Sequence, residues 1–314
     1  MNWKANLFKD FSKLGPLIGL IIMVIFLGFM SDAFFTLDNI LNLLRQISVN
    51  ALIAFGMTFV ILTAGIDLSV GSLLALGSAL TAGLLTSGMD PMLAVLLGLL
   101  IGLGLGAING LIITKGKVAP FIATLATMTV YRGATLVYTD GMPVTGLSDS
   151  FAFEMIGGGY VFGIPFPVIL MLAVFLILFF VLKKTVFGRQ VYAVGGNEEV
   201  SVLSGIKADR VKIWVYSLTG MLSVLAGLIL TSRLNSAQPT AGEMFELDAI
   251  AAVVIGGTSL MGGRGRITGT LIGALIIGVI DNGLNLMNVS SFYQQIVKGG
   301  VILLAVLLDR KSNK

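Results

Sequence analysis

The chain has 314 residues, of which 56% are hydrophobic and only 11% are charged, and its mean hydropathy is +0.99. It contains no His and no Cys, which excludes an imidazole base, a thiolate nucleophile, a disulfide and a Cys/His metal site built from this chain alone. The net charge of +4 does not indicate nucleic-acid binding, because most of the basic residues lie in loops between apolar runs. We therefore expect a polytopic membrane protein without catalytic residues, cofactor, metal site or nucleic-acid partner.

Ten apolar runs predict the spans, since a helix satisfies its own backbone hydrogen bonds in lipid. In chain order they are Leu14–Met30, Val49–Ala64, Ser72–Ser87, Pro91–Ile113, Val118–Tyr138, Gly163–Leu182, Val211–Ser232, Asp248–Met261, Ile267–Met287 and Phe292–Leu308. The run Asp248–Met261 is short for a full crossing, so we expect it to be tilted, broken or partly re-entrant. The predicted fold class is all-α, with residues 1–314 forming a single transmembrane domain of about ten helices.

The loop charges predict the orientation. With the N-terminus in the cytoplasm, sixteen of the twenty Lys and Arg residues lie on the cytoplasmic side. They are Lys4, Lys9, Lys13, Lys115, Lys117, Lys183, Lys184, Arg189, Lys207, Arg210, Lys212, Arg264, Arg266, Arg310, Lys311 and Lys314. An excess of basic residues marks cytoplasmic loops, so both termini are predicted to be cytoplasmic.

Two glycine series have the spacing of a close helix contact. Gly98, Gly102, Gly106 and Gly110 recur every four residues, and Gly265, Gly269 and Gly273 do the same later in the chain. Small residues at this spacing let helix backbones approach each other. The series indicate either static tight packing or an interface along which helices slide.

A short sequence echo suggests an internal repeat. Ala107-Ile-Asn-Gly-Leu111 and Ile280-Asp-Asn-Gly-Leu284 share Asn-Gly-Leu on predicted helices of opposite direction, each followed by one further span. Inverted repeats near 49–138 and 211–308 would produce this pattern, which is common in transporters, although chance is the alternative for three residues.

Ionisable residues between or within apolar runs are candidates for function. Gly65, Asp67, Ser69 and Gly71 bracket a predicted helix break, where Asp67 or Ser69 either caps the following helix or takes part in gating. Asp281 and Lys298, in the last two runs, either pair with each other or reach toward an interface.

Two connections carry further candidate residues. The outer loop Leu234–Gly242 is polar and uncharged, with Ser236, Gln238, Pro239 and Thr240 as candidates to meet a neutral partner or a sugar.

The inner segment Gly195–Gly205 predicts a short helix with Asn197 as its N-cap, acidic residues in the first turn and Gly205 at its end. Displayed in the cytoplasm, Val200 and Leu203 suggest docking to a partner; the alternative is a solvated loop that folds back on the membrane. The candidate docking residues are Gly195, Gly196, Asn197, Glu198, Val200, Leu203 and Gly205.

Long motifs resemble one family, the permease subunits of bacterial ABC sugar importers. They are Ser48–Leu52, Gly56–Ser72, Pro120–Leu125, Ala193–Asn197, Ser236–Gly242 and Glu246–Leu260. The resemblance implies the type II importer fold, a bacterial cytoplasmic (inner) membrane location and a monosaccharide cargo, with ribose favoured over xylose, arabinose, galactose and autoinducer-2.

The resemblance also implies the partners: a second permease copy in a homodimer, a cytoplasmic ATP-binding subunit, an extracytoplasmic sugar-binding protein and membrane lipid. It places Gly195–Gly205 at the coupling contact with the ATPase. The chain has no phosphate loop, because Gly116-Lys117 is followed by Val118, so ATP hydrolysis needs another polypeptide. The rival hypotheses are an ion-coupled secondary sugar transporter and, less favoured, a membrane scaffold or receptor.

The predicted topology can be tested with single cysteines, because the chain has none of its own. A cysteine at Ser148, in the predicted outer segment 139–164, should react with an impermeant thiol reagent in intact cells. One at Ser201, in the predicted inner segment, should stay unlabelled. The reverse pattern would contradict the orientation.

Overall fold

Helices make up most of the chain, as expected for a backbone that must satisfy its hydrogen bonds away from water. The computed structural model describes residues 3–147 and 150–312. Its helices are α1 (Trp3–Met30), α2 (Leu37–Leu62), α3 (Val70–Thr86), α4 (Pro91–Thr114), α5 (Pro120–Thr139), α6 (Phe151–Gly157), α7 (Phe166–Lys184), α8 (Val186–Gly196), α9 (Glu198–Leu203), α10 (Ala208–Leu234), α11 (Phe245–Ile255), α12 (Ile267–Leu286) and α13 (Ser291–Ser312).

Each of the ten predicted spans overlaps one of these helices. Within the described residues, five helices are long and apolar enough to cross a membrane, namely α2, α4, α7, α10 and α12. The chain is therefore a multi-pass membrane protein by length and composition. The count of ten crossings stays a prediction, because α11 has only 11 residues and α3 only 17.

The largest boundary error of the sequence prediction concerns α2, which begins at Leu37 instead of Val49. Polar residues at its start hid the helix, but they find partners within the protein. The amides of Asn39 and Asn282 exchange hydrogen bonds of 3.1 and 2.8 Å, and Arg45 donates to Asn42 at 2.7 Å. Because these polar groups are hydrogen-bonded, the helix can extend beyond the apolar run from which the sequence predicted its start.

The run Asp248–Met261 is broken, which was one of its three predicted forms. Helix α11 ends at Ile255, and residues 256–266 are not helical. Gly257, Gly262 and Gly263 have positive φ angles in this segment, a backbone conformation that glycine adopts without steric cost. We call residues 256–266 the glycine loop.

The all-α prediction missed four strands of two residues each. Strand β1 (Val144–Thr145) pairs antiparallel with β4 (Ser236–Ala237), in the register Val144↔Ala237. Strands β2 (Tyr160–Val161) and β3 (Ile164–Pro165) form a hairpin. Strands this short leave no alternation to recognise in a sequence.

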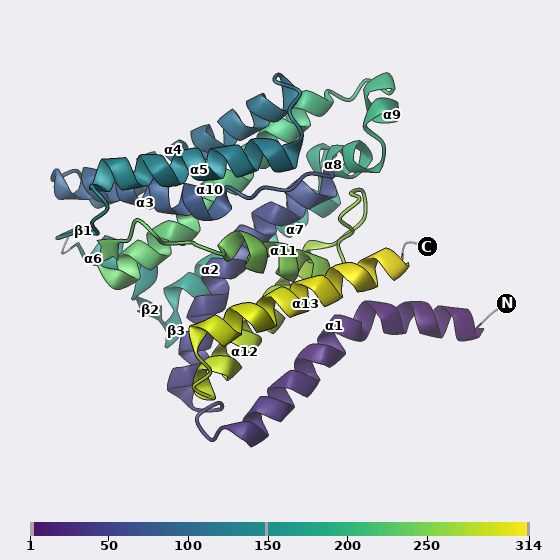
Figure 1. The fold of residues 1–314 in the computed structure, drawn as a ribbon, viewed down its shortest axis with the longest axis horizontal. Coiled ribbons are helices and arrows are strands. Elements are labelled where there is room, and N and C mark those ends of the chain that lie inside the picture. Colours follow the sequence, from purple (N-terminus) through teal and green to yellow (C-terminus); the bar gives the residue numbers. More distant parts are fainter. Residues whose placement is uncertain (1–2, 148–149, 313–314) are drawn as a thin grey trace.

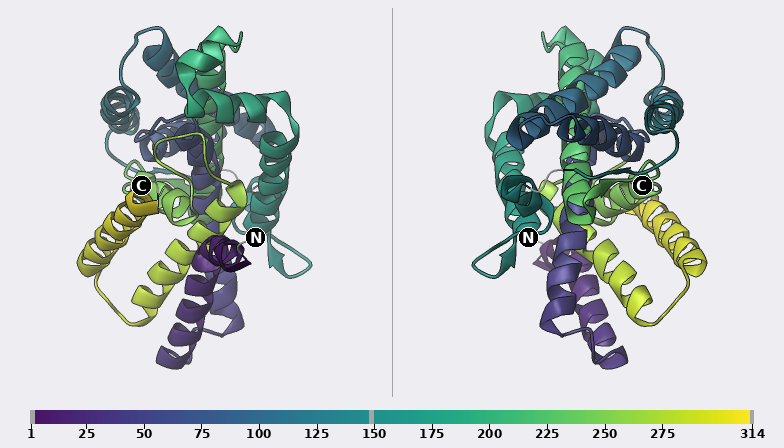
Figure 2. Two further views of the ribbon diagram at one scale, coloured as in Figure 1. Left: turned by 90° about the vertical axis from the view of Figure 1, so that its right-hand side faces the viewer. Right: turned by 90° about the vertical axis from the view of Figure 1, so that its left-hand side faces the viewer.

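Helices α2 and α10 run through the middle of the bundle, with α1 and α13 at its edge (Figures 1 and 2). Every residue of α2 from Ile47 to Leu62 is buried, and so is Thr63, which follows the helix. The two termini lie on the same side of the molecule as α8 and α9, opposite the short strands (Figure 1). A helix that is buried all round explains why this segment is apolar on every face.

The helix contacts fall into two matching sets. In the first set, α4 packs on α10, and α3 contacts α4, α5 and α10. In the second set, α12 packs on α2, and α11 contacts α12, α13 and α2. Exchanging α2–α5 with α10–α13 converts the first set into the second. The central contact, between α2 and α10, is unchanged by the exchange.

The first glycine series lies in a close helix contact, which both of its interpretations require. A Cβ at Gly102 would lie 2.7 Å from the carbonyl oxygen of Gly220, and one at Gly110 would lie 2.7 Å from Cα of Ile213, both in α10. The second series brings α12 against α11, where a Cβ at Gly273 would meet the backbone oxygen of Ala252. These contacts hold backbones closer than any side chain allows.

The close contact between α4 and α10 predicts the effect of one methyl group. A Cβ at Gly106 would collide with the carbonyl oxygen of Tyr216 and lie 2.9 Å from Cα of Ser217, whereas one at Gly104 would meet nothing within 4 Å. We expect Gly106→Ala to destabilise the fold by about 1–3 kcal/mol through overpacking. The measurement is thermal unfolding of the purified protein in detergent.

Gly104→Ala is the matched control in the same helix. It should be neutral or slightly stabilising, because Ala has the higher helix propensity. Equal unfolding temperatures for the two variants would contradict the proposed role of the glycine series.

The structure also sharpens the topology test. Ser148 lies outside the described residues, and Ser201 is only 5% exposed, so a cysteine at Ser201 would be silent from either side. Phe162, which is fully exposed, and the exposed Ser204 are better positions. A cysteine at Phe162 should react in intact cells, and one at Ser204 should react only after the membrane is opened.

Candidate functional site

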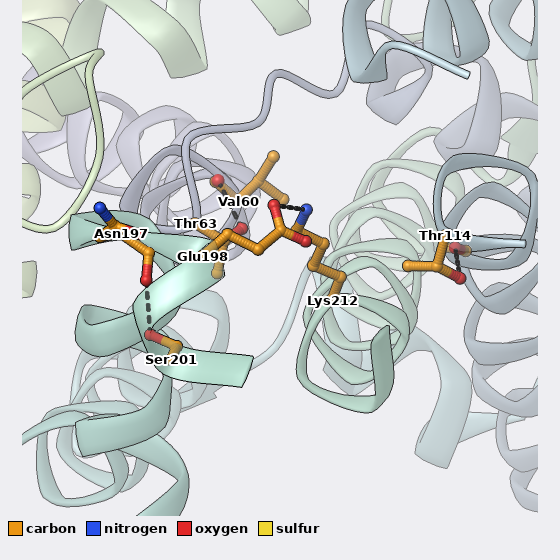
Figure 3. Close-up of polar contacts among 8 residues, drawn as sticks. Val60, Thr63, Thr114, Asn197, Glu198, Ser201 and Lys212 are labelled. Atoms are coloured by element: carbon orange, nitrogen blue, oxygen red, sulfur yellow. Dashed lines mark hydrogen bonds and ion pairs between the residues drawn. The ribbon is translucent and has the colours of Figure 1, made fainter. Parts of the chain in front are cut away.

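Helix α9 is the short helix that the sequence predicts, and its two ends are closed as expected. The Asn197 side chain accepts a hydrogen bond of 2.9 Å from the Val200 amide. Ser201 Oγ donates to the Asn197 carbonyl at 2.7 Å, as Figure 3 shows. At the other end Gly205 has a φ of +84°, and its amide and that of Ile206 close the last turn. Both helix ends are thus satisfied locally, so α9 forms on the surface.

Apolar side chains of α9 point away from the protein. Val200 is 56% exposed and Leu203 is 87% exposed. Val202, which the sequence analysis did not select, is 54% exposed. Lys212 of α10 fixes the helix by an ion pair of 2.6 Å with Glu198 (Figure 3). Exposed apolar side chains on a fixed helix form a surface suited to a protein partner.

Gly195 and Gly196 do not belong to this surface helix; they end α8, which the sequence analysis did not predict. Gly195 is buried against the end of α2, where a Cβ would collide with the carbonyl oxygen of Leu62. That oxygen accepts a hydrogen bond of 3.0 Å from the amide of Gly263, in the glycine loop. Tyr192 of α8 donates to the Gly265 carbonyl at 3.0 Å. The candidate docking segment therefore rests on α2 and on the glycine loop.

The break between α2 and α3 is held by Asp67. Its Oδ1 accepts hydrogen bonds from the Ser69 amide at 2.9 Å and from Ser69 Oγ at 2.6 Å. Ser69 occupies the N-cap position of α3, yet its side chain makes no capping bond to the helix. Of the two predicted capping residues, Asp67 thus stabilises the turn before the helix. The Ser69 hydroxyl instead links Asp67 to the side chain of Asn109.

A chain of polar side chains continues from this break. Asn109 of α4 donates to Ser69 Oγ at 2.7 Å, and Tyr131 of α5 donates to Asn109 Oδ1 at 3.2 Å. The side chains of Asp67, Ser69 and Asn109 are fully buried. The sequence analysis noticed Asn109 only as part of the repeat echo. Buried polar networks of this kind fix the relative positions of the helices that contribute to them.

The loop Leu234–Gly242, which precedes α11, approaches the break between α2 and α3 at Gly71 and Gly242. Gly71, at the start of α3, has no room for a side chain because a Cβ would collide with the carbonyl oxygen of Gly242. Gly242 has a φ of +76°. Gly65 is similarly confined, since a Cβ would lie 2.5 Å from the Tyr216 hydroxyl. Gly71 requires glycine for this close backbone approach, whereas the near neighbour of Gly65 is the end of a tyrosine side chain.

The loop Leu234–Gly242 is less exposed than a sugar-facing surface would be. Ser236 and Pro239 are buried, Gln238 is half-buried and only Thr240 among the four candidates is exposed. Gln238 donates to Ser236 Oγ at 2.8 Å. Arg132 of α5 donates to the carbonyls of Pro239 and Ala241 at 2.6 and 2.9 Å.

Sequence reasoning missed Arg132, although an ionised side chain within a predicted span is a recognisable signal. Its guanidinium holds the loop to α5, so much of the loop's polarity is satisfied internally.

Lys298 joins the last three helices and pairs with Asp281, which is one of the two alternatives that the sequence left open. Its Nζ lies 3.0 Å from Oδ2 of Asp281 in α12 and 3.0 Å from Oδ2 of Asp248 in α11. The two carboxylates are almost completely buried. Asp248 was not expected to take part, because the sequence places it fifty residues from Lys298. One ammonium group thus neutralises part of a buried acidic pair.

A model of the family described as "branched-chain amino acid transport system / permease component" matches residues 39–306. The chain belongs to this permease family.

Individual relatives cover almost the whole of this permease. It is 67% identical over 301 residues to the ribose import permease protein of Bacillus subtilis (strain 168), covering 96% of this chain and 94% of that protein. It is 54% identical over 298 residues to the ribose import permease protein of Escherichia coli (strain K12), with 94% and 93% covered. The D-allose transport system permease protein of the same strain is 46% identical over 304 residues, with 96% and 93% covered. No solved structure matches this chain.

The family match confirms the predicted class: this permease is a transport component and not an enzyme. It also removes the scaffold or receptor hypothesis. The roles predicted for individual residues are not decided by the match and remain proposals.

The buried ion pairs of the permease predict a large effect of one substitution. Lys298→Met leaves Asp248 and Asp281 without a positive partner in a buried position. We expect a loss of about 3–5 kcal/mol in stability, the usual cost of breaking a buried ion pair from one side. The measurement is thermal unfolding in detergent.

Two comparisons control this experiment. Combining Lys298→Met with Asp248→Asn and Asp281→Asn should recover most of the loss, because no unpaired charge remains. Lys115→Met removes an exposed ion pair of 2.6 Å with Asp209 and should cost less than about 1 kcal/mol. A Lys298→Met variant as stable as Lys115→Met would contradict the assignment.

Proposed function

We propose that this permease is the membrane-spanning subunit of an ATP-driven importer that moves ribose across the bacterial cytoplasmic membrane. Ribose is supported by the 67% and 54% identity to two permeases named for ribose import, against 46% to one named for D-allose. The proposed partners are a cytoplasmic ATP-binding subunit, an extracytoplasmic sugar-binding protein, a second copy of the permease and membrane lipid. The proposed fold is that of type II importers.

The proposed membrane arrangement has ten crossings with both termini in the cytoplasm. It is supported by the positions of the termini, which lie on the same side of the molecule as the basic segment around α8 and α9 (Figure 1). We propose inverted repeats near 49–138 and 211–308, because exchanging α2–α5 with α10–α13 converts the contacts of α3 and α4 into those of α11 and α12 described above.

In this arrangement the breaks before α3 and α11 are equivalent, and they meet where Gly71 approaches Gly242. We assign Gly65, Asp67, Ser69 and Gly71 to the fixed geometry of the first break, through the hydrogen bonds of Asp67 and Asn109.

The observation that carries the ATPase proposal is the exposure of apolar side chains on α9, a helix whose ends and ion pair fix it to the bundle. A helix fixed to the bundle in this way can transmit a movement of a bound partner protein to the bundle. Behind it, Gly195 and Gly196 contact the end of α2 and the glycine loop, which connect to α3 and α12. Movement of α8 and α9 would therefore reach the break before α3 and the glycine loop through backbone contacts.

The docking role predicts the effect of placing charge on α9. We expect Val200→Asp combined with Leu203→Asp to abolish both sugar uptake and co-purification of the ATP-binding subunit. Apolar anchors at the centre of an interface usually supply most of its binding energy. Membrane insertion and thermal stability should be unchanged, since both side chains are exposed.

Phe162→Asp is the matched control, because it places a charge on an exposed apolar position at the opposite side of the molecule. It should leave co-purification of the ATP-binding subunit intact. Normal uptake and normal co-purification in the α9 variant would remove this segment from the mechanism.

The rival function is ion-coupled transport, and it makes a different energetic prediction. Vesicles with trapped ATP and all partner proteins should accumulate ribose when an uncoupler collapses the proton gradient. The chain has no His, the buried acids Asp248 and Asp281 are bound to Lys298, and the buried Asp67 is hydrogen-bonded to Ser69, so a continuous proton path lacks carriers. Accumulation that stops with the uncoupler while ATP persists would contradict the ATP-driven proposal.

The same vesicles test the sugar. Unlabelled ribose should compete with labelled ribose more strongly than D-allose does. Stronger competition by D-allose would transfer the substrate assignment to that sugar and leave the transport mechanism standing.

A further inference from the structure

A basic cleft lies where α8 meets the start of α10. Its volume is about 450 Å³, and it is lined by Phe187, Gln190, Gly205, Lys207, Arg210, Val211 and Trp214. None of these lining residues is acidic. The cleft belongs neither to the exposed apolar side chains of α9 nor to the polar network around Asp67.

The basic side chains of this region divide into two kinds. Lys115 and Lys212 form ion pairs with Asp209 and Glu198. Within the described part of the chain, Lys207 and Arg210 form no ion pair with any carboxylate, and both line the cleft. The cleft thus holds two basic side chains that no carboxylate pairs with.

At the start of α10, two basic side chains are followed by a tryptophan, which is the order in which headgroups and then acyl chains follow each other in a membrane. Lys207 immediately precedes the helix, Arg210 lies in its first turn and Trp214 follows one turn later on the same face. Trp214 is 59% exposed, at the start of a helix long and apolar enough to span. Tryptophan concentrates where headgroups meet acyl chains, and basic side chains reach toward the headgroups.

We propose that this cleft binds the headgroup of an anionic phospholipid from the cytoplasmic leaflet. Lys207 and Arg210 contact the phosphate, Gln190 donates to its polar substituents, and Phe187, Val211 and Trp214 contact the glycerol and upper acyl region. Basic pockets at the cytoplasmic ends of membrane helices have this chemistry. The bound lipid would link α8, which carries α9, to the start of α10.

A neighbouring cleft is less suited to an anion. It shares Gly205, Lys207 and Arg210, but it is also lined by Asp209 and by its partner Lys115, so its charge is partly compensated. It lacks an aromatic residue among its lining residues. Of these two clefts, the first combines bases without a carboxylate partner with an exposed tryptophan.

Tryptophan fluorescence tests the proposal on the full chain. The protein has two tryptophans, so Trp3→Phe leaves Trp214 as the only one. This variant is reconstituted in phosphatidylcholine vesicles containing a small share of spin-labelled phosphatidylglycerol or spin-labelled phosphatidylcholine. We expect the anionic lipid to quench Trp214 preferentially. Each basic side chain near an anionic headgroup strengthens binding about fivefold, so Lys207→Gln with Arg210→Gln should lower the preference about 25-fold or abolish it.

Two further variants act as controls. One tests whether any loss of surface charge lowers the lipid preference, and the other tests whether substitution at the two cleft positions disturbs the fold. Lys117→Gln with Arg189→Gln removes one exposed Lys and one exposed Arg outside the cleft and should keep the preference. Lys207→Arg with Arg210→Lys keeps the charge and should retain most of it. Equal quenching by both lipids in the Trp3→Phe variant, or equal loss in the Lys117/Arg189 variant, would overturn the proposal.

The ATP-binding subunit is the competing occupant, and the same variants identify it. Under the lipid proposal, the preference persists in the assembled complex, and Lys207→Gln with Arg210→Gln leaves co-purification intact. Protection of Trp214 from both lipids on adding the ATP-binding subunit, together with lost co-purification of the double variant, would assign the cleft to the protein interface and overturn the lipid site.

Discussion

The carbonyl end of α2 is the point on which the arrangement of the permease depends. A helix leaves its last carbonyl groups without partners, and at this buried end water cannot supply them. The Leu62 oxygen accepts from the Gly263 amide and lies directly against Gly195. One backbone group therefore joins the central helix, the glycine loop and the end of α8. Side chains at these glycines would separate the three segments, so the contact requires backbone on every side.

Polar residues inside the bundle act mainly by fixing helices to one another. Asp67, Ser69 and Asn109 connect the break before α3 to α4, and Tyr131 extends the connection to α5. Lys298 connects α13 to α11 and α12. In surroundings without water, such bonds are retained because their loss would leave buried groups unsatisfied. The bonds of Asp67 hold the break before α3 in a defined position, and those of Arg132 hold the loop before α11.

The side of the bundle that carries α8 and α9 combines a protein surface with a lipid site in our interpretation. Val200 and Leu203 face outward on α9, whereas Lys207, Arg210 and Trp214 line the cleft between α8 and α10. The two features share the connection through Gly205. A force on α9 and the occupancy of the cleft would thus act on the same short segment, which leads to α2 through Gly195.

The sequence by itself determined the membrane class, the approximate helices, the glycine packing faces and the capped helix after Asn197, because these follow from local composition and spacing. It placed the start of α2 twelve residues late, missed α8 and β1–β4, and did not reveal that Ser236 and Pro239 are buried. Only the tertiary structure decided the partners of Asn109, Arg132, Asp248 and Leu62, since each bond joins segments far apart in the chain. Hydropathy reports the tendency of a segment to leave water, and it does not state which distant group satisfies the polar atoms carried with it.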